Sequence, residues 1–169
     1  ALSPAGYATG IFGKWHLGDS YPMRPQDQGF QEVLVHRGGG IGQPSDPPEG
    51  AGKYTDPVLF HNGEQKQMKG YCTDVYFDHA MKFIQKNESQ EKPTFMYIAT
   101  NAPHGPFHDV PEDLREKYEA MDLNDAYGFD MSKRRKNKKQ FDKTARIFSM
   151  IENIDQNIGK LFQHLKKIG

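Results

Sequence analysis

A glycine-rich stretch near the start of the chain, residues 6–18, limits the possible folds more than any other segment. It carries a short apolar run directly into Lys14, Trp15 and His16. Side chains alternate between the two faces of an extended backbone, so we expect Lys14 and His16 to share one face. Trp15 and Leu17 are then expected to point the other way, into the core. A lysine near a histidine can form a site for an anionic group, although most such pairs are merely solvated.

The positions around this pair decide between the two interpretations. Six residues match the pattern Gly-Tyr-x-Thr-x-x-x-Gly-Lys-x-His: Gly6, Tyr7, Thr9, Gly13, Lys14 and His16. This pattern resembles a signature segment of the sulfatases, the formylglycine-dependent sulfate ester hydrolases of the alkaline phosphatase-like superfamily. The resemblance covers most of the chain and leaves only residues 121–140 without a counterpart. The other matching segments are 24–30, 62–63, 70–74, 93–107 and 150–165.

Length and charge agree with part of a soluble globular enzyme. The 169 residues include 22 basic and 22 acidic side chains, so no global charge favours nucleic acid or a membrane surface as partner. No apolar run approaches the length that spans a bilayer. The chain starts at Ala1 without an initiator methionine, as if cut from a longer protein, and therefore carries no evidence on its compartment. The family resemblance implies a secreted, periplasmic or lysosomal protein.

Hydrophobic periodicity predicts an α/β fold. Residues 8–12 and 94–99 have the pattern of buried strands, whereas residues 71–86, 111–120 and 147–165 have the pattern of helices. Strands that alternate with helices indicate a sheet with helical cover. Two strong strands are too few for a complete sheet. Together with the resemblance, they predict a partial alkaline phosphatase-like (sulfatase) sheet with flanking helices, incomplete in this chain.

The long segment between the two strands is rich in glycine and proline and is expected to be mostly irregular. It covers residues 24–70, with a small hairpin that turns at Asn62 and Gly63. Thr73 is then a plausible N-cap for the next helix, because its hydroxyl can accept a backbone N–H.

The last helix carries an apolar stripe at intervals of three and four residues. The stripe consists of Ile147, Ile151, Ile154, Ile158, Leu161 and Leu165. Such a stripe suits a coiled coil or a partner helix, and it also suits packing on the sheet of the same chain. The second arrangement is commoner, and we predict it here.

A second candidate site residue, His104, directly follows the strand predicted over residues 94–99. Ligands of open α/β sheets bind beyond the carboxyl ends of the strands. Prolines on both sides restrict the backbone near the ring, so the loop can hold an imidazole at low entropic cost. A histidine that only caps the strand end fits equally well, whereas the resemblance implies contact with the sulfate or its leaving oxygen. His36 lies in a stretch that runs near the substrate in sulfatases, and we predict that it lines the site.

The resemblance also implies a role for each candidate residue. In sulfatases a hydrated formylglycine attacks sulfur beside a calcium ion, and Lys14 would bridge this nucleophile and a sulfate oxygen. His16 would hydrogen-bond the formylglycine and assist the elimination of sulfate. His104 would bind the sulfate and protonate the leaving group. The predicted catalytic residues are therefore Lys14, His16 and His104, and the predicted substrate-binding residues are Lys14, His104 and His36.

The nucleophile and the metal ligands have no candidates in this chain. The formylglycine precursor sits in Cys-x-Pro-x-Arg, and the one cysteine, Cys72, lacks that proline and arginine. We expect Cys72 to be a small buried residue at a helix start. Residues 1–169 are therefore predicted to be part of a single sulfatase catalytic domain that lacks its N-terminal nucleophile segment and its C-terminal metal-site segment. Formylglycine and the calcium ligands are expected outside the chain, which alone is expected to be inactive.

Two other functions fit the same residues. One is a phosphodiesterase or phosphonate hydrolase of the same superfamily, which an unmodified nucleophile upstream would favour. The other is a non-catalytic module that binds sulfated glycans through Lys14, His104 and the basic run Lys133–Lys139. That run suits either a polyanion patch or a solvated loop before the last helix, and the loop fits better. The sequence leaves open the oligomeric state and whether the sulfate ester is a small aryl sulfate or a sulfated glycan.

Overall fold

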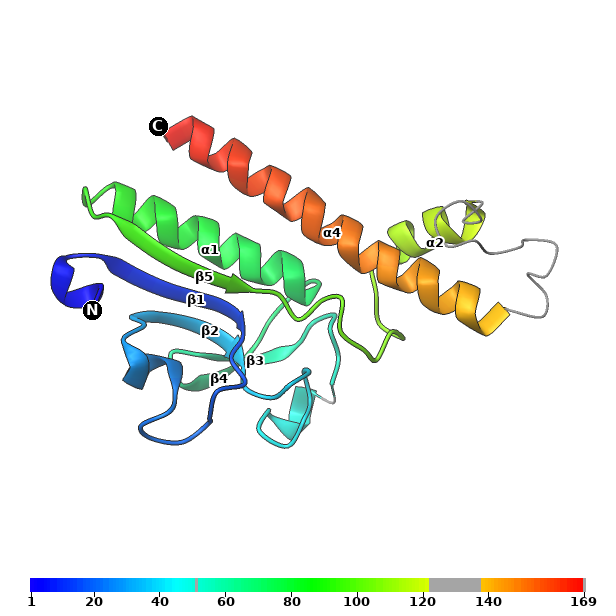
Figure 1. The fold of residues 1–169 in the computed structure, drawn as a ribbon, viewed down its shortest axis with the longest axis horizontal. Coiled ribbons are helices and arrows are strands. Elements are labelled where there is room, and N and C mark those ends of the chain that lie inside the picture. The colour runs from blue at the N-terminus through cyan, green and yellow to red at the C-terminus, as the bar shows by residue number, and fades with distance from the viewer. Residues whose placement is uncertain (51, 122–137, 169) are drawn as a thin grey trace.

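A computed structural model describes residues 1–50, 52–121 and 138–168, which form one mixed sheet with helices packed against it (Figure 1). The sheet has five strands in the order β4-β3-β2-β1-β5. Their bounds are Ala8–Lys14 for β1, Glu32–His36 for β2, Val58–His61 for β3, Glu64–Gln67 for β4 and Thr94–Ala99 for β5. The predicted α/β class is confirmed, with more strands in the described part than the sequence pattern indicated.

Strand β1 is an interior strand of the sheet that pairs in parallel with both β2 and β5. It extends two residues beyond the predicted end at Phe12, to Lys14. Gly13 has a φ of +126°, and a Cβ at this position would stand 1.9 Å from the carbonyl oxygen of Ala99. Only glycine therefore allows β1 and β5 to approach as closely as they do.

Strand β2 corrects the prediction of an irregular segment over residues 24–70. Its buried core is only Val33, Leu34 and Val35, a run too short to stand out among the surrounding glycines and prolines. Antiparallel pairing joins β2 to β3 and β3 to β4. The predicted hairpin turn is confirmed, since Asn62 and Gly63 both have positive φ, +51° and +93°.

Helix α1, Cys72–Glu88, covers one face of the sheet through the apolar side that the sequence predicted. Tyr76, Ala80 and Phe83 on this side are buried against Phe12 and Leu34. Thr73 is not the N-cap: that position is Tyr71, and Thr73 lies fully buried in the first turn.

Helices α2, Glu112–Ala120, and α4, Lys138–Ile168, pack on each other, and α4 also lies against α1 (Figure 1). The predicted packing of the α4 stripe on the sheet is wrong. Ile151 is 46% exposed, and Ile158 and Leu165 are exposed as well. The buried face of α4 instead has a residue every fourth position, namely Ala145, Ser149, Asn153 and Asn157.

Polar contacts explain why this face of α4 turns toward α1. The Asp74 carboxylate of α1 accepts hydrogen bonds from the side-chain amides of Asn153 at 3.0 Å and Asn157 at 2.6 Å. Met150, which is fully buried on α4, also joins the apolar core that includes Tyr76 and Ala80 of α1. Helix α4 therefore rests on α1, which itself covers the sheet. Within the stripe, Ile154 packs against the core, whereas Ile151 and Ile158 are exposed.

The second face of the sheet carries its own apolar cluster. Trp15 is buried there with Ile11 and Val33, as the alternation along β1 predicted. Leu17 is 61% exposed, contrary to the prediction, because the strand ends before it. Tyr97 on the edge strand β5 is 48% exposed. None of the helices among the described residues is both long and apolar enough to cross a membrane.

Candidate active site

The three parallel strands β1, β2 and β5 have their carboxyl ends side by side. This side of the sheet is called the strand edge. Strand β1 ends at Lys14, β2 at His36 and β5 at Ala99. The register pairs Lys14 with His36, and Gly13 with Ala99. The loops that follow these strands therefore leave the sheet together, at the edge where α/β folds bind ligands.

The position of His16 at this edge does not follow from the alternation of side chains along β1. The ladder of hydrogen bonds continues past the strand, from Trp15 N–H to the His36 carbonyl at 3.0 Å and from His16 N–H to the Arg37 carbonyl at 3.1 Å. His16 has a φ of +53°, in the left-handed region. The period-two argument for a shared face with Lys14 does not apply to His16, because β1 has already ended at Lys14.

A glycine loop brings the rings of His16 and His104 together. A Cβ on Gly39 would lie 2.9 Å from His16 Cε1, and a Cβ on Gly40 would lie 3.3 Å from His104 Cε1 and Nδ1. The two imidazoles therefore lie over consecutive residues of one loop, and a side chain at position 39 would overlap the first ring. From the sequence, this triple glycine suggested only an irregular loop, because contacts between distant segments leave no local pattern.

Polar side chains fix this glycine loop from inside. Asp46, which is buried, accepts the Arg37 N–H at 2.6 Å and the Gly42 N–H at 3.2 Å. Gln43 Oε1 accepts the Gly39 N–H at 2.7 Å. Burial raises the pKa of Asp46, and the hydrogen bonds from backbone N–H groups act against that rise. These bonds hold the platform on which the two histidine rings rest.

His104 lies in a loop that is anchored through its own backbone. Its Nδ1 faces the carbonyl of Gly105, and a carbonyl can only accept, so Nδ1 carries a proton and Nε2 is left for a ligand. The buried Tyr54 hydroxyl donates to the Gly105 carbonyl at 2.8 Å and lies 3.3 Å from the His104 carbonyl. Asp109, farther along the loop, accepts the backbone N–H groups of Tyr54 at 2.6 Å and Thr55 at 2.7 Å.

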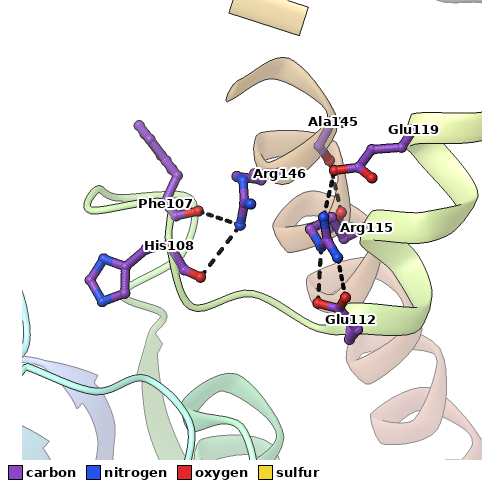
Figure 2. A network of polar contacts seen from close by, with 8 residues as sticks. Phe107, His108, Glu112, Arg115, Glu119, Ala145 and Arg146 are labelled. Atoms are coloured by element: carbon purple, nitrogen blue, oxygen red, sulfur yellow. Dashed lines mark hydrogen bonds and ion pairs between the residues drawn. The ribbon is translucent and has the colours of Figure 1, made fainter. Parts of the chain in front are cut away.

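Helix α4 holds the same loop from the other side. Arg146 Nη1 donates to the Phe107 carbonyl at 3.1 Å and lies 3.4 Å from the His108 carbonyl (Figure 2). Arg115 of α2 instead pairs with glutamates of its own helix in the same view. Sequence reasoning missed both Arg146 and Tyr54, whose partners in the loop lie 38 to 51 positions away.

His36 lies at the same strand edge but beneath the surface. It is 0% exposed, its Nδ1 is 2.9 Å from the Tyr76 hydroxyl, and its Nε2 has no hydrogen-bond partner among the described residues. Asn101, also buried, leaves both atoms of its side-chain amide unpaired within the same set of residues. Unpaired polar groups in a protein interior are rare and need an explanation. His36 presents no exposed atom to a substrate here, so its assignment to substrate binding stays a prediction.

The charges of the other three candidate residues act on the buried His36 ring. Burial lowers the pKa of His36 to about 3, and the charges of Lys14, His104 and His16 act in the same direction. The amide of Asn101 opposes this shift from nearby, although it forms no hydrogen bond with the ring. The structure therefore brings all four predicted residues to one edge, with His36 as a neutral group underneath.

Replacing His36 tests this buried, neutral state. Below about pH 6.5 an unfolded histidine takes up a proton, whereas folded His36 stays neutral until the pH approaches about 3. The unfolded state then binds more protons, so this one group lowers the free energy of unfolding by about 2 kcal/mol between pH 7 and pH 5. Urea unfolding at pH 7 and at pH 5 measures this fall in the free energy of unfolding. The fall should be about 2 kcal/mol smaller in His36→Asn than in the wild type. His108→Asn, whose ring is exposed, is the control, and an unchanged pH dependence in His36→Asn would contradict the prediction.

The described residues do not fit either cofactor that the family resemblance implies. Among them, no three His, Cys, Asp or Glu side chains are grouped so that they could hold a metal ion. The carboxylates of Asp46 and Asp109 are engaged by backbone N–H groups and are not free to meet the oxygen-rich coordination of calcium. Cys72 is fully buried, as predicted, and burial raises the pKa of its thiol to about 12. Neither a calcium site nor a formylglycine precursor can be assigned to these residues.

Comparison with known proteins agrees with this geometry. A family model described as Sulfatase matches residues 1–169. An uncharacterized sulfatase of Schizosaccharomyces pombe is 26% identical over 211 residues, covering 99% of this chain and 37% of that protein. An N-acetylglucosamine-6-O-sulfatase of Bacteroides thetaiotaomicron is 32% identical over 113 residues, covering 67% of this chain and 17% of that protein.

A solved structure shares the fold along nearly the whole chain. The crystal structure of Ps i-CgsB in complex with k-i-k-neocarrahexaose has a TM-score of 0.74 and 27% sequence identity. The match covers 99% of this chain and 35% of that one. The chain thus spans little more than a third of the length of the Schizosaccharomyces pombe protein and of Ps i-CgsB.

Proposed function

Because this chain belongs to the sulfatase family, we propose that it supplies the sulfate-binding side of the active site of an enzyme that hydrolyses sulfate monoesters. The resemblance first seen in residues 6–18 is confirmed by the family model, and the partial alkaline phosphatase-like sheet is confirmed by the shared fold. One observation supports the proposal: Lys14, His16 and His104 all lie where neighbouring parallel strands end, and the rings of His16 and His104 lie next to consecutive residues of one glycine loop.

This arrangement suits the charge of the substrate. A sulfate monoester carries a negative charge that protonation cannot remove near neutral pH, so attack at sulfur needs fixed positive groups around the sulfuryl oxygens. The Lys14 ammonium provides such a charge at the end of β1, an interior strand of the sheet. The imidazoles of His16 and His104 add directed hydrogen-bond donors. The strand ladder holds the backbone of His16, and Tyr54 and Arg146 hold the loop of His104, so we expect little reorganisation as negative charge develops.

His104 is the proposed proton donor to the leaving oxygen. Its Nδ1–H is held by the Gly105 carbonyl, so a protonated ring presents its second proton at Nε2. Transfer of this proton to the leaving oxygen forms a neutral alcohol and leaves a neutral imidazole. General acid catalysis of this kind contributes typically about 10²- to 10⁴-fold. Lys14 and His16 then bind the sulfate oxygens, and His16 is the one we place beside the nucleophile.

The nucleophile and the calcium ion are proposed to come from other segments of a longer protein. Neither fits the residues described here, and the chain spans about a third of its relatives. Large apolar side chains that stay exposed, Tyr97 on β5 and Ile151 on α4, support further packing partners. We accordingly propose that residues 1–169 are one part of a single catalytic domain. Other segments of the longer protein would supply the formylglycine and the calcium ligands, so residues 1–169 alone should be inactive.

A sulfated glycan is the proposed substrate class. One relative is named for a sulfate on N-acetylglucosamine, and the solved neighbour was crystallised with an oligosaccharide. An arylsulfatase of Klebsiella aerogenes also matches the chain, with 29% identity over 120 residues, so aryl esters are useful test substrates.

The test is turnover by the full-length protein that contains this chain. We expect release of sulfate from N-acetylglucosamine 6-sulfate or 4-nitrophenyl sulfate, and little hydrolysis of bis(4-nitrophenyl) phosphate. Residues 1–169 alone should release no sulfate from either ester. Preference for the phosphodiester would favour the phosphodiesterase alternative, and glycan binding without any turnover would favour a non-catalytic module.

A further inference from the structure

A row of positive charge lies at the start of the described part of α4. Lys139, Lys143 and Arg146 are spaced by four and three residues, so they share one face of the helix over about 10 Å. Lys138 stands beside them, and the rest of the basic run predicted over Lys133–Lys139 lies outside the described residues. The predicted loop therefore does not include Lys138 and Lys139, which are helical.

This row is unfavourable for the helix itself. Like charges four residues apart repel, and cations near the N-terminal end of a helix oppose its dipole. Lys138, Lys139 and Lys143 are exposed and form no ion pair with any residue that the structure describes. A row of like charges that disfavours the helix suits a role in binding an anionic partner.

The row borders an open hollow next to the loop of His104. The hollow has a volume of about 840 Å³ and is lined by Phe107 together with Lys138, Lys139, Lys143 and Arg146. The Lys143 ammonium lies 5.4 Å from the centre of the Phe107 ring. Asp142 contributes the single carboxylate of this lining among the described residues, so positive charge predominates.

We propose that this hollow, defined by Phe107 and the α4 lysines, is a second binding site for a sulfated polysaccharide whose reacting ester lies at Lys14 and His104. Phe107 is three residues from His104 in the same loop, and Arg146 binds the carbonyls of Phe107 and His108 (Figure 2). A polymer that leaves the strand edge along this loop reaches the basic face of α4 next. Its sulfate groups pair with the lysines, and a sugar ring packs on the face of Phe107.

A sulfated polysaccharide fits better here than a nucleic acid. An aromatic ring among cations can also stack a base. The hollow, however, continues from the loop that carries His104, so its occupant is expected to be an extension of the same molecule that carries the sulfate ester. This inference rests on the proposed function, because it takes that ester to belong to a polymer.

The test compares two triple variants on the same helix of the full-length protein. Lys138→Gln, Lys139→Gln and Lys143→Gln together should raise the Kd for fluorescently labelled dextran sulfate roughly tenfold, as expected for the loss of three exposed ion pairs. The rise should shrink in high salt, which screens such pairs. The matched control is Lys160→Gln, Lys166→Gln and Lys167→Gln near the other end of α4, which should leave the Kd within about twofold. Glutamine keeps helix propensity, so both variants should retain the helix.

Each outcome separates this inference from the proposed function. Equal Kd values for the two triple variants would overturn the second site. Displacement of dextran sulfate by a single-stranded DNA of equal charge, as effective as displacement by unlabelled dextran sulfate, would overturn the preference for a glycan. If the wild-type protein hydrolyses no sulfate ester, the proposed function fails, while the comparison of Kd values still decides whether α4 binds sulfated polymer.

Discussion

Lys14→Ala is expected to lower kcat/KM for a sulfate ester by roughly 100-fold or more in the full-length protein, as removal of an oxyanion donor does in other hydrolases. Lys14 is the last residue of β1, and its neighbour across the ladder, His36, is neutral and buried. The rings of His16 and His104 supply donors but not a permanent charge. The loss should therefore appear mainly in kcat, since the charge on the oxygens grows in the transition state.

An exposed lysine provides the control for this variant. Lys69→Ala removes the same charge from a loop beyond the hairpin and should change kcat/KM by less than about twofold. Thermal unfolding of both variants should match that of the wild type, because neither lysine is buried. A loss below about threefold for Lys14→Ala would remove Lys14 from the site.

His104→Gln is the second large effect, and its size should depend on the leaving group. With a sugar sulfate, whose leaving alkoxide needs a proton, kcat should fall by roughly 10³-fold. With 4-nitrophenyl sulfate, whose leaving phenolate is stable without protonation, the fall should be only about tenfold and should reflect the lost contact with sulfate. The ratio of the two effects measures proton donation apart from binding.

His108 allows a matched control in the same loop. Its ring is exposed, and the contact described for it in the structure is made by its backbone carbonyl, so His108→Gln should be almost silent with both esters. Equal losses with both esters in His104→Gln would rule out proton donation and leave only a binding role. No loss with either ester would take His104 out of the active site.

Sequence reasoning brought Lys14 and His104 to the same end of the sheet because parallel strands share a direction. Lys14 and His104 each follow a segment whose apolar content predicts a buried strand, and parallel strands end at the same edge. That argument required no knowledge of the intervening loops. It worked less well for His16, whose left-handed backbone conformation depends on the contact with the β2 end and not on its own strand.

Other parts of the molecule could not be predicted because their cause is distant in sequence. Strand β2 has only three strongly apolar residues and is a strand because β1 and β3 flank it. The stripe on α4 predicted the wrong buried face, because the Asp74 carboxylate draws Asn153 and Asn157 toward α1. Tyr54 and Arg146 support the His104 loop through backbone carbonyls, which carry no sequence signal.

The most direct test is a crystal structure of the full-length protein grown or soaked with inorganic sulfate. A single sulfate ion should lie over the glycine loop, with its oxygens about 2.7–3.2 Å from Lys14 Nζ, a ring nitrogen of His16 and His104 Nε2. A sulfate ion bound elsewhere, or one that touches only one of these three groups while the others point away, would contradict the account.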